Sequence, residues 1–217
     1  MAPAAPTPRD RRQPILWIIA GPNGSGKSTL YNRTDIEDWG GTVWIINPDL
    51  LTARLRAAES LSEQDANVAA LNRIERWLDA SIDVHQTIGV ETVLSTPKYR
   101  MLIERAKEKG FEIRMLYVLL DSAERQIERV RIRVARGGHD VPEDKIRARR
   151  LRSFDQLALF AKHVDRLMIF DNSTAEPKLL AAKRFKEPLR ILRALPPDLL
   201  DRLEAPATPM ERRSAGD

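Results

Sequence analysis

Short apolar runs alternate along this chain with longer segments in which apolar residues recur every three or four positions. Runs of the first kind predict β-strands, and segments of the second kind predict helices with one buried face. Because strands and helices alternate, the fold class is α/β, with a five-stranded parallel sheet built from βαβ units. The strands are expected at residues 14–20, 42–46, 90–94, 113–120 and 166–170.

Helices are expected between these strands, and Pro or Gly residues mark several of their boundaries. One helix is predicted by a stripe of apolar residues at Leu71, Ile74, Leu78 and Ile82. The stretch 175–203 is expected to be helical as well and peripheral to the sheet. The other helices are expected at residues 26–33, 48–58, 99–109, 122–136 and 142–162.

The composition suits a single domain, since 42% of the 217 residues are hydrophobic. Segments 1–13 and 205–217 lack such patterning, so we expect two disordered tails around one domain at 14–204. The absence of cysteine excludes disulfides and thiolate metal sites. No apolar run approaches the ~20 residues of a membrane span. The N-terminus lacks the apolar core of a signal peptide, so a cytoplasmic protein is expected.

Residues 21–28, Gly-Pro-Asn-Gly-Ser-Gly-Lys-Ser, match the G-x-x-x-x-G-K-[ST] pattern of a phosphate-binding P-loop. The pattern lies between a predicted strand and a predicted helix, which is the context that it requires. Lys27 would reach the β- and γ-phosphates of a nucleoside triphosphate, and the Ser28 hydroxyl would hold Mg²⁺. The alternative is an ordinary glycine-rich turn. The nucleotide-binding residues predicted here are Gly21, Pro22, Asn23, Gly24, Ser25, Gly26, Lys27, Ser28 and Thr29.

Carboxylates near the strand ends are the next candidates, because ligands of open parallel sheets lie at the carboxyl ends of the strands. Asp49 can accept the proton of a hydroxyl that attacks a phosphoryl group, or it can simply favour a helix N-terminus. Glu91 lies in an apolar strand and either faces outward or points into the cleft, where it can hold an acceptor hydroxyl or a water on Mg²⁺. Asp121 resembles a Walker B carboxylate but equally suits a helix cap.

Arginines are concentrated in the region of about 122–162, where Gly137 and Gly138 separate two predicted helices. Such a region can form a closing lid whose arginines offset charge on a transferred phosphoryl group. The alternative is a solvated basic face paired with nearby glutamates. The net charge is +5, but aromatic residues are nearly absent from this region, so nucleic-acid binding is not expected. The arginines are Arg125, Arg129, Arg131, Arg133, Arg136, Arg147, Arg149, Arg150 and Arg152.

Taken in order, several motifs together resemble the zeta toxin family of P-loop kinases, in its branch of chromosomal zeta-like proteins. The resemblance covers about residues 14–175 and implies a three-layer P-loop kinase fold with a helical arginine-rich lid. The motifs are residues 21–29, Asn-Pro-Asp at 47–49, Glu-Thr-Val-Leu-Ser at 91–95, Arg-Val-Ala-Arg-Gly-Gly-His-Asp-Val-Pro at 133–142, the run 146–153 and Asp-Asn-Ser at 171–173.

The resemblance implies an enzyme that uses ATP and Mg²⁺ to phosphorylate a hydroxyl of a small metabolite, above all the amino sugar of UDP-N-acetylglucosamine. It also implies a small helical antitoxin as a partner. Asp49 would be the catalytic base. The catalytic residues carried over by match are Lys27, Asp49, Arg133, Arg149 and Arg152, and the acceptor-site residues are Asn47, Glu91 and Thr92.

Two alternatives stay open at this point. The first is a kinase of another small acceptor, such as a dinucleotide or an amino acid, because relatives in the wider family differ in their acceptors. The second is a regulatory, nucleic-acid-associated NTPase that uses the basic lid on phosphate backbones, which would make its nucleic-acid binding sensitive to salt.

Overall fold

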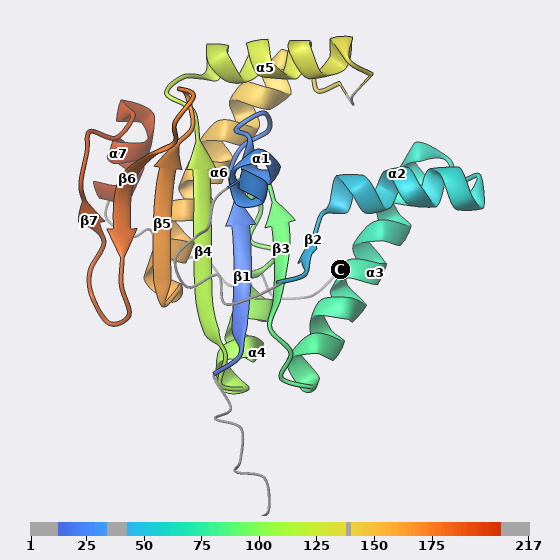
Figure 1. Ribbon diagram of the computed structural model, residues 1–217, viewed down its shortest axis with the longest axis horizontal. Coiled ribbons are helices and arrows are strands. Elements are labelled where there is room, and N and C mark those ends of the chain that lie inside the picture. The colour runs from blue at the N-terminus through green and yellow to red at the C-terminus, as the bar shows by residue number, and fades with distance from the viewer. Residues whose placement is uncertain (1–12, 34–42, 138–139, 205–217) are drawn as a thin grey trace, which may run out of the picture.

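The computed structural model describes residues 13–33, 43–137 and 140–204, and within them a seven-stranded sheet in the order β2-β3-β1-β4-β5-β6-β7 (Figure 1). The strands are β1 (Ile15–Ala20), β2 (Ile45–Ile46), β3 (Ile88–Thr92), β4 (Glu112–Leu119), β5 (Arg166–Asp171), β6 (Lys178–Lys183) and β7 (Arg190–Ile191). The helices are α1 (Lys27–Arg33), α2 (Pro48–Glu59), α3 (Glu63–Asp83), α4 (Arg100–Glu108), α5 (Ala123–Ala135), α6 (Glu143–His163) and α7 (Pro197–Glu204).

Strands β1 to β5 run parallel, as the alternation of strands and helices predicts. β1 lies between β3 and β4, and its Ile19 is in register with Glu91 on β3 and Leu116 on β4. The register continues to Ala20 and Thr92, so β1 and β3 end at the same level. The polar residues that follow these strands therefore meet at one edge of the sheet.

Two further strands extend the sheet beyond β5, and here the predicted helix at 175–203 is wrong. β6 pairs antiparallel with β5, β7 pairs antiparallel with β6, and only α7 is helical in this stretch. The sequence of β6, Lys-Leu-Leu-Ala-Ala-Lys, is rich in helix formers. Pairing along the open edge of β5 and burial of Leu180 and Ala181 override that propensity.

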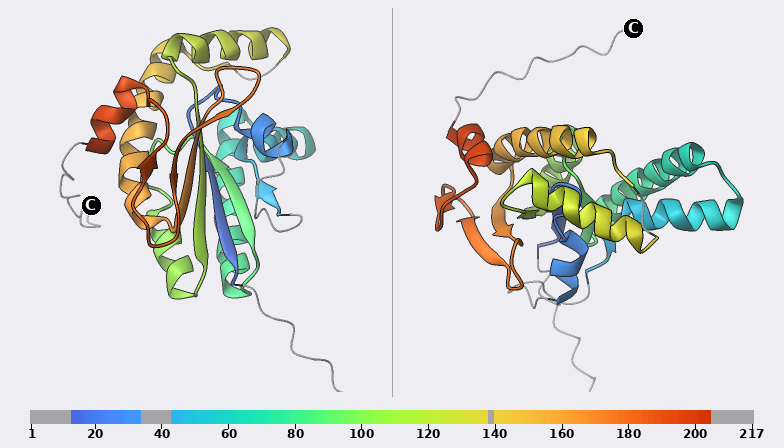
Figure 2. Two further views of the ribbon diagram at one scale, coloured as in Figure 1. Left: turned by 60° about the vertical axis from the view of Figure 1, so that its left-hand side comes forward. Right: turned by 90° about the horizontal axis from the view of Figure 1, so that it is seen from above.

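Helices cover both faces of the sheet, which gives the expected three layers (Figure 2). On one face, residues of α3, α4, α6 and α7 share a buried cluster with Leu16 and Tyr117. On the other face, α1 packs through Leu30 on Trp17 and Leu116. α5 lies across the carboxyl ends of the strands, and α2 and α3 extend past the edge strand β2 (Figure 1). No helix in the described ranges is long and apolar enough to cross a membrane.

The helices expected to form the lid have different surroundings. α5 lies above the ends of the strands, whereas α6 packs into the core through Phe154, Leu157 and Phe160. Between them, residues 138 and 139 lie outside the described part of the chain, as do nearly all residues of the two expected tails. The second strand is shorter than expected, Ile45–Ile46, and residue 42 is not described.

Candidate active site

The P-loop leaves β1 at Gly21, and the backbone there demands glycine. Gly21 has a φ of 142°, and a Cβ atom at this position would lie 2.0 Å from the carbonyl oxygen of Val118 on β4. No side chain fits such a gap, so only glycine lets the chain turn over the edge of the sheet. The loop then closes on itself, since the Ser25 N–H donates to the carbonyl oxygen of Pro22 at 3.3 Å.

Lys27, the first residue of α1, points back into the loop. Its Nζ donates to the carbonyl oxygens of Gly21 and Pro22 at 2.8 and 3.3 Å and lies 3.9 Å from Oε1 of Glu91. Burial lowers the pKa of Lys27, the carboxylates of Glu91 and Asp49 oppose this, and the charge of Arg133 adds to the lowering. A buried cation of this kind gains stability when an anion such as a phosphate group arrives beside it.

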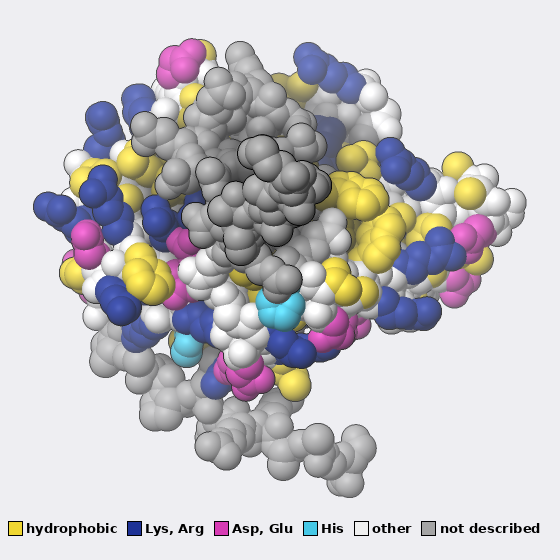
Figure 3. All heavy atoms as spheres, turned by 60° about the horizontal axis from the view of Figure 1, so that its bottom comes forward, with side chains coloured by type: hydrophobic (Ala, Val, Ile, Leu, Met, Phe, Trp, Pro, Cys, Tyr) yellow, Lys and Arg dark blue, Asp and Glu magenta, His cyan; other side chains and the backbone are white. Residues whose placement is uncertain are grey.

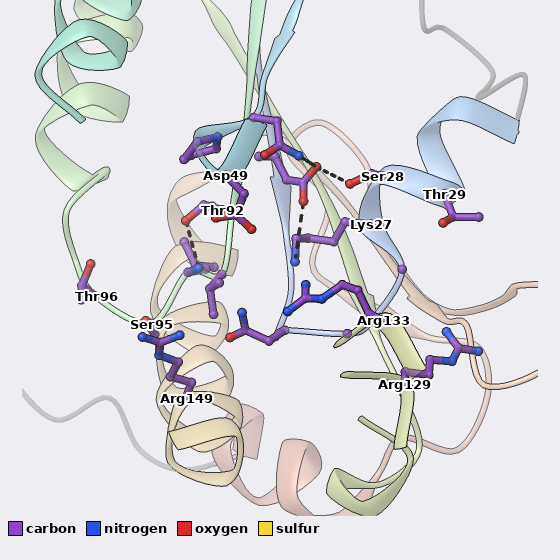
Figure 4. A pocket seen from close by; sticks show the side chains of 18 of the residues that line it. Lys27, Ser28, Thr29, Asp49, Thr92, Ser95, Thr96, Arg129, Arg133 and Arg149 are labelled. Atoms are coloured by element: carbon purple, nitrogen blue, oxygen red, sulfur yellow. Dashed lines mark hydrogen bonds and ion pairs between the residues drawn. The ribbon is translucent and has the colours of Figure 1, made fainter. Parts of the chain in front are cut away.

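Glu91 is the point at which the polar side chains of the site meet. Its Oε2 accepts hydrogen bonds from the hydroxyls of Ser28 and Tyr31 at 2.8 and 3.2 Å and from Nδ2 of Asn47 at 2.9 Å. Dashed lines in Figure 4 mark contacts that the labelled residues Ser28 and Lys27 make in the site. Of the two orientations that the sequence allows for Glu91, the structure therefore has the inward one.

Asn47 connects this network to the start of α2. Its Oδ1 accepts from the N–H of Leu50 at 3.2 Å and caps the helix, while its Nδ2 donates to Glu91. The cap fixes the first turn of α2, which carries Asp49. In Figure 4, Asp49 lies beside Thr92 and faces Lys27 across the site. Asp49 thus occupies a favourable first-turn position of α2 and also lines the cavity, and its role as a proton acceptor stays a prediction.

These groups surround a cavity of about 900 Å³. Among the residues predicted from sequence, Gly21, Pro22 and Ser25 form the P-loop backbone without lining the cavity. Arg152 is an exposed residue of α6 and also lies outside the lining. The predicted residues that do line the cavity are Asn23, Gly24, Gly26, Lys27, Ser28, Thr29, Asn47, Asp49, Glu91, Thr92, Arg133 and Arg149.

Several arginines line the cavity opposite Asp49. Arg133 and Arg136 come from the last part of α5 and the residue after it, and Arg149 comes from α6. Figure 4 shows Arg133 pointing toward Lys27, whereas Arg129 points away from it. The Nη2 of Arg129 instead donates to the carbonyl oxygen of Asn172 at 2.6 Å, just after β5.

Other arginines of the same region pair with acidic side chains on the surface. Arg147 donates to Glu124 at 2.6 Å, and Arg131 donates to Glu143. The hydrogen bond from Arg125, at 3.0 Å, is the main reason why the pKa of Asp121 is lowered. Some arginines of this region therefore line the cavity and others form ion pairs at the surface, among them Arg125 with Asp121. A closing lid stays a prediction.

The side-chain oxygens of Ser28 and Glu91, beside the P-loop, suit the coordination of Mg²⁺. The Ser28 hydroxyl and the Glu91 carboxylate lie 2.8 Å apart, and Mg²⁺ prefers such hard oxygen ligands. Within the described ranges, no group of three or more His, Asp and Glu residues could hold a metal ion. These two residues would therefore share the ion with oxygens of a bound nucleotide and of water.

Sequence reasoning missed Tyr31, which shapes the site, and it gave no role to Asn172, although the motif 171–173 includes it. Tyr31 follows Lys27 by four positions, a spacing that places both on one face of α1 and could have identified it. Asn172 donates from Nδ2 to the carbonyl oxygen of Ser25 at 2.9 Å, across a large separation in sequence. No local pattern predicts a contact of that second kind.

Comparisons with known proteins agree with this architecture. A profile of the AAA domain family AAA_33 matches residues 16–157. An uncharacterized protein of Haemophilus influenzae is 27% identical over 144 residues, which cover 62% of this chain and 96% of that protein.

Two solved structures share the fold. A chain of the PezAT chromosomal toxin–antitoxin system of Streptococcus pneumoniae is 16% identical with a TM-score of 0.58, covering 80% of this chain and 73% of that chain. A chain of the AvrRxo1-ORF1:AvrRxo1-ORF2 complex, solved with ATP, is 18% identical with a TM-score of 0.66, covering 96% and 67%. The P-loop kinase fold that the resemblance to zeta toxins implies is thus confirmed.

Proposed function

Because the chain belongs to the AAA domain family AAA_33, and because its P-loop opens onto a polar cavity, we propose that it is an ATP-dependent kinase of small molecules. It would transfer the γ-phosphoryl group of ATP to a hydroxyl group. One observation carries the proposal. Lys27 and Ser28, on the nucleotide side, face Asp49, on the opposite side of one cavity that is lined on a third side by Arg133 and Arg149.

The residues divide the work as phosphoryl transfer requires. The P-loop N–H groups and Lys27 hold the phosphates of ATP, and Asp49 orients the acceptor hydroxyl and takes its proton. Arg133, which points toward Lys27, offsets the negative charge that develops on the transferred group. Ser28 and Glu91 would hold Mg²⁺, which when bound neutralises charge on the β- and γ-phosphates.

We propose UDP-N-acetylglucosamine as the acceptor. The last residue of β3 and the loop after it line the cavity with the hydroxyl-bearing residues Thr92, Ser95 and Thr96, which suit a sugar. Lys98 and Arg149 line the same region and suit the charged diphosphate of a nucleotide sugar. A small protein that covers this cavity would be the corresponding antitoxin, a proposal supported by the two-protein systems to which both solved neighbours belong.

A mass-spectrometric assay tests the reaction and its acceptor together. The protein and Mg·ATP are incubated with UDP-N-acetylglucosamine and, separately, with a bacterial metabolite extract. We expect the sugar nucleotide to gain one phosphoryl group. A gain on a different metabolite would contradict the acceptor and keep the kinase. Hydrolysis of ATP without any phosphorylated acceptor would contradict the kinase and favour a regulatory NTPase.

A further inference from the structure

Arg150 on α6 is a buried cation with no part in the chemistry proposed above. Only 2% of it is exposed, and its guanidinium carbon lies 4.6 Å from the centroid of the Phe154 ring. The guanidinium donates to three elements at once. Its bonds go to Asp198 on α7 at 2.8 and 3.3 Å, to the carbonyl oxygen of Leu120 after β4 at 2.8 Å, and to Oε1 of Gln126 on α5 at 3.0 Å. A buried charge is tolerated only with such complete pairing.

Gln126 links Arg150 to the P-loop through hydrogen bonds. It is fully buried, and while its Oε1 accepts from Arg150, its Nε2 donates to the carbonyl oxygen of Asn23 at 3.0 Å. Because Arg150 can only donate, it orients the amide of Gln126 with the N–H₂ group toward Asn23. A continuous chain of hydrogen bonds therefore runs from Asp198 through Arg150 and Gln126 to the phosphate-binding loop.

α5 also packs directly against the P-loop at Gly24. Gly24 has a φ of 75°, and a Cβ atom there would lie 3.0 Å from the carbonyl oxygen of Gln126 and 3.2 Å from Cγ2 of Val130. The glycine thus lets the first turns of α5 touch the loop backbone. Arg133 follows Gln126 by seven positions, which is two helical turns and the same face of α5. A helix held at Gln126 therefore presents Arg133 to the cavity.

We propose that Gln126 and Arg150 are positioning residues for the nucleotide site, and that α7 is part of this site through Asp198. They fix the position of Asn23 in the P-loop and the rotation of α5 about its axis. The inference rests on the proposed binding of ATP. It assigns a functional role to a C-terminal helix that lies beyond the region 16–157 matched by the family profile.

Gln126→Glu isolates the contact to the P-loop. The new carboxylate still accepts from Arg150 but cannot donate to the Asn23 carbonyl. We expect ATP binding, measured by calorimetry, to weaken about tenfold, which corresponds to the loss of one buried hydrogen bond. The KM for ATP should rise while the KM for the acceptor stays unchanged. If Gln126 only stabilised the fold, Gln126→Glu would lower the melting temperature without a selective rise in the KM for ATP.

Two substitutions at the interface of α6 and α7 provide a matched pair. Asp198→Asn removes the charge that Arg150 faces. Asp155→Asn removes a carboxylate of the same interface that accepts a hydrogen bond from Arg202 at 2.6 Å and leaves the hydrogen bonds of Arg150 and Gln126 in place. We expect weaker ATP binding in Asp198→Asn and wild-type binding in Asp155→Asn. Equal ATP affinity in Gln126→Glu, Asp198→Asn and wild type would overturn the inference alone. Failure of the wild type to bind ATP would instead overturn the proposed function.

Discussion

At the scale of single residues, the site is organised around buried charges. Lys27 is 8% exposed and is held by backbone carbonyl oxygens, with its nearest carboxylate, Glu91, at 3.9 Å. Glu91 in turn is occupied by three hydrogen-bond donors. The cation is therefore only partly compensated, and the triphosphate of ATP would supply the missing negative charge.

ATP binding should depend on the protonation of Lys27. Burial lowers the pKa of Lys27 from 10.5, so the amine loses its proton at a lower pH than an ordinary lysine does. Phosphate favours the charged form, so binding should take up a proton and weaken as the pH rises through that lowered pKa. Titration calorimetry between pH 7 and 10 in buffers of different ionisation enthalpy measures this uptake. Lys27→Arg, which stays charged, should flatten the dependence; a pH-independent wild type would contradict the assignment.

The sequence predicts where the P-loop lies because its residues are contiguous and the motif requires a strand before it and a helix after it, while nucleotide binding by these residues stays a prediction. It leaves Asp49 and Glu91 with two interpretations each, because their roles depend on side-chain direction. It also cannot choose between Arg149 and Arg152, which are three positions apart on α6. The rotation of α6 about its axis determines which of the two faces the cavity, and it places Arg149 in the lining and Arg152 outside it.

At the scale of elements, α6 is a core helix that is hard to identify from the sequence, because polar residues interrupt its apolar face. Its buried face includes Arg150 and Ser153 beside Phe154 and Leu157, so the apolar stripe in the sequence is interrupted. The arginines of this helix suggest a lid, whereas long-range hydrogen bonds join it to the rest of the core. β6 is the opposite case, since its leucines and alanines favour a helix, whereas pairing with β5 and burial make it a strand.

Ser153→Ala should destabilise the protein by about 1–3 kcal/mol, because it leaves buried polar groups without their partner. The Ser153 Oγ donates to the carbonyl oxygen of Val93 at 2.7 Å and lies 2.6 Å from the hydroxyl of Tyr117. Urea unfolding monitored by circular dichroism measures the change. The double variant Ser153→Ala/Tyr117→Phe should cost less than the sum of the single variants. Strictly additive losses would contradict this shared network.

At the scale of the whole molecule, the surface charge of one face can be compared with the charge at the cavity. Figure 3 shows Lys and Arg side chains dispersed over the visible part of the lower face, with Asp and Glu side chains between them. No continuous basic track is visible on that part of the surface, although the net charge is +5. We assign a function to the basic side chains at the cavity, and the ligand that we propose for them is a small anionic molecule.

An ion-pair cluster at the other end of the sheet should make stability sensitive to acid. Burial pushes the pKa of Glu112 upward, but the hydrogen bonds and charges of Arg114 and Arg166 outweigh it and hold the pKa below 4.5. A lowered carboxylate pKa stabilises the fold above its unfolded value, and this contribution is lost as the pH falls through the folded value.

Glu112→Gln should therefore be less stable than wild type at pH 7, and the difference should shrink as the pH falls below 4.5. Urea midpoints measured at several pH values give the comparison, with Glu104→Gln as a control, since Glu104 is an exposed residue paired with Arg100 within α4. A difference that stays constant down to acid unfolding would show that Glu112 contributes by packing rather than by charge.

The central claim is that the nucleotide binds on one side of the cavity and that Asp49, on the opposite side, removes the proton of the acceptor hydroxyl. The most direct test follows transfer of the γ-phosphoryl group from labelled ATP to a metabolite in wild type and in Asp49→Asn, with ATP affinity measured in both. We predict a loss of transfer of at least about 100-fold with ATP binding retained. Transfer at the wild-type rate in Asp49→Asn, or no transfer by the wild type to any metabolite, would contradict the account.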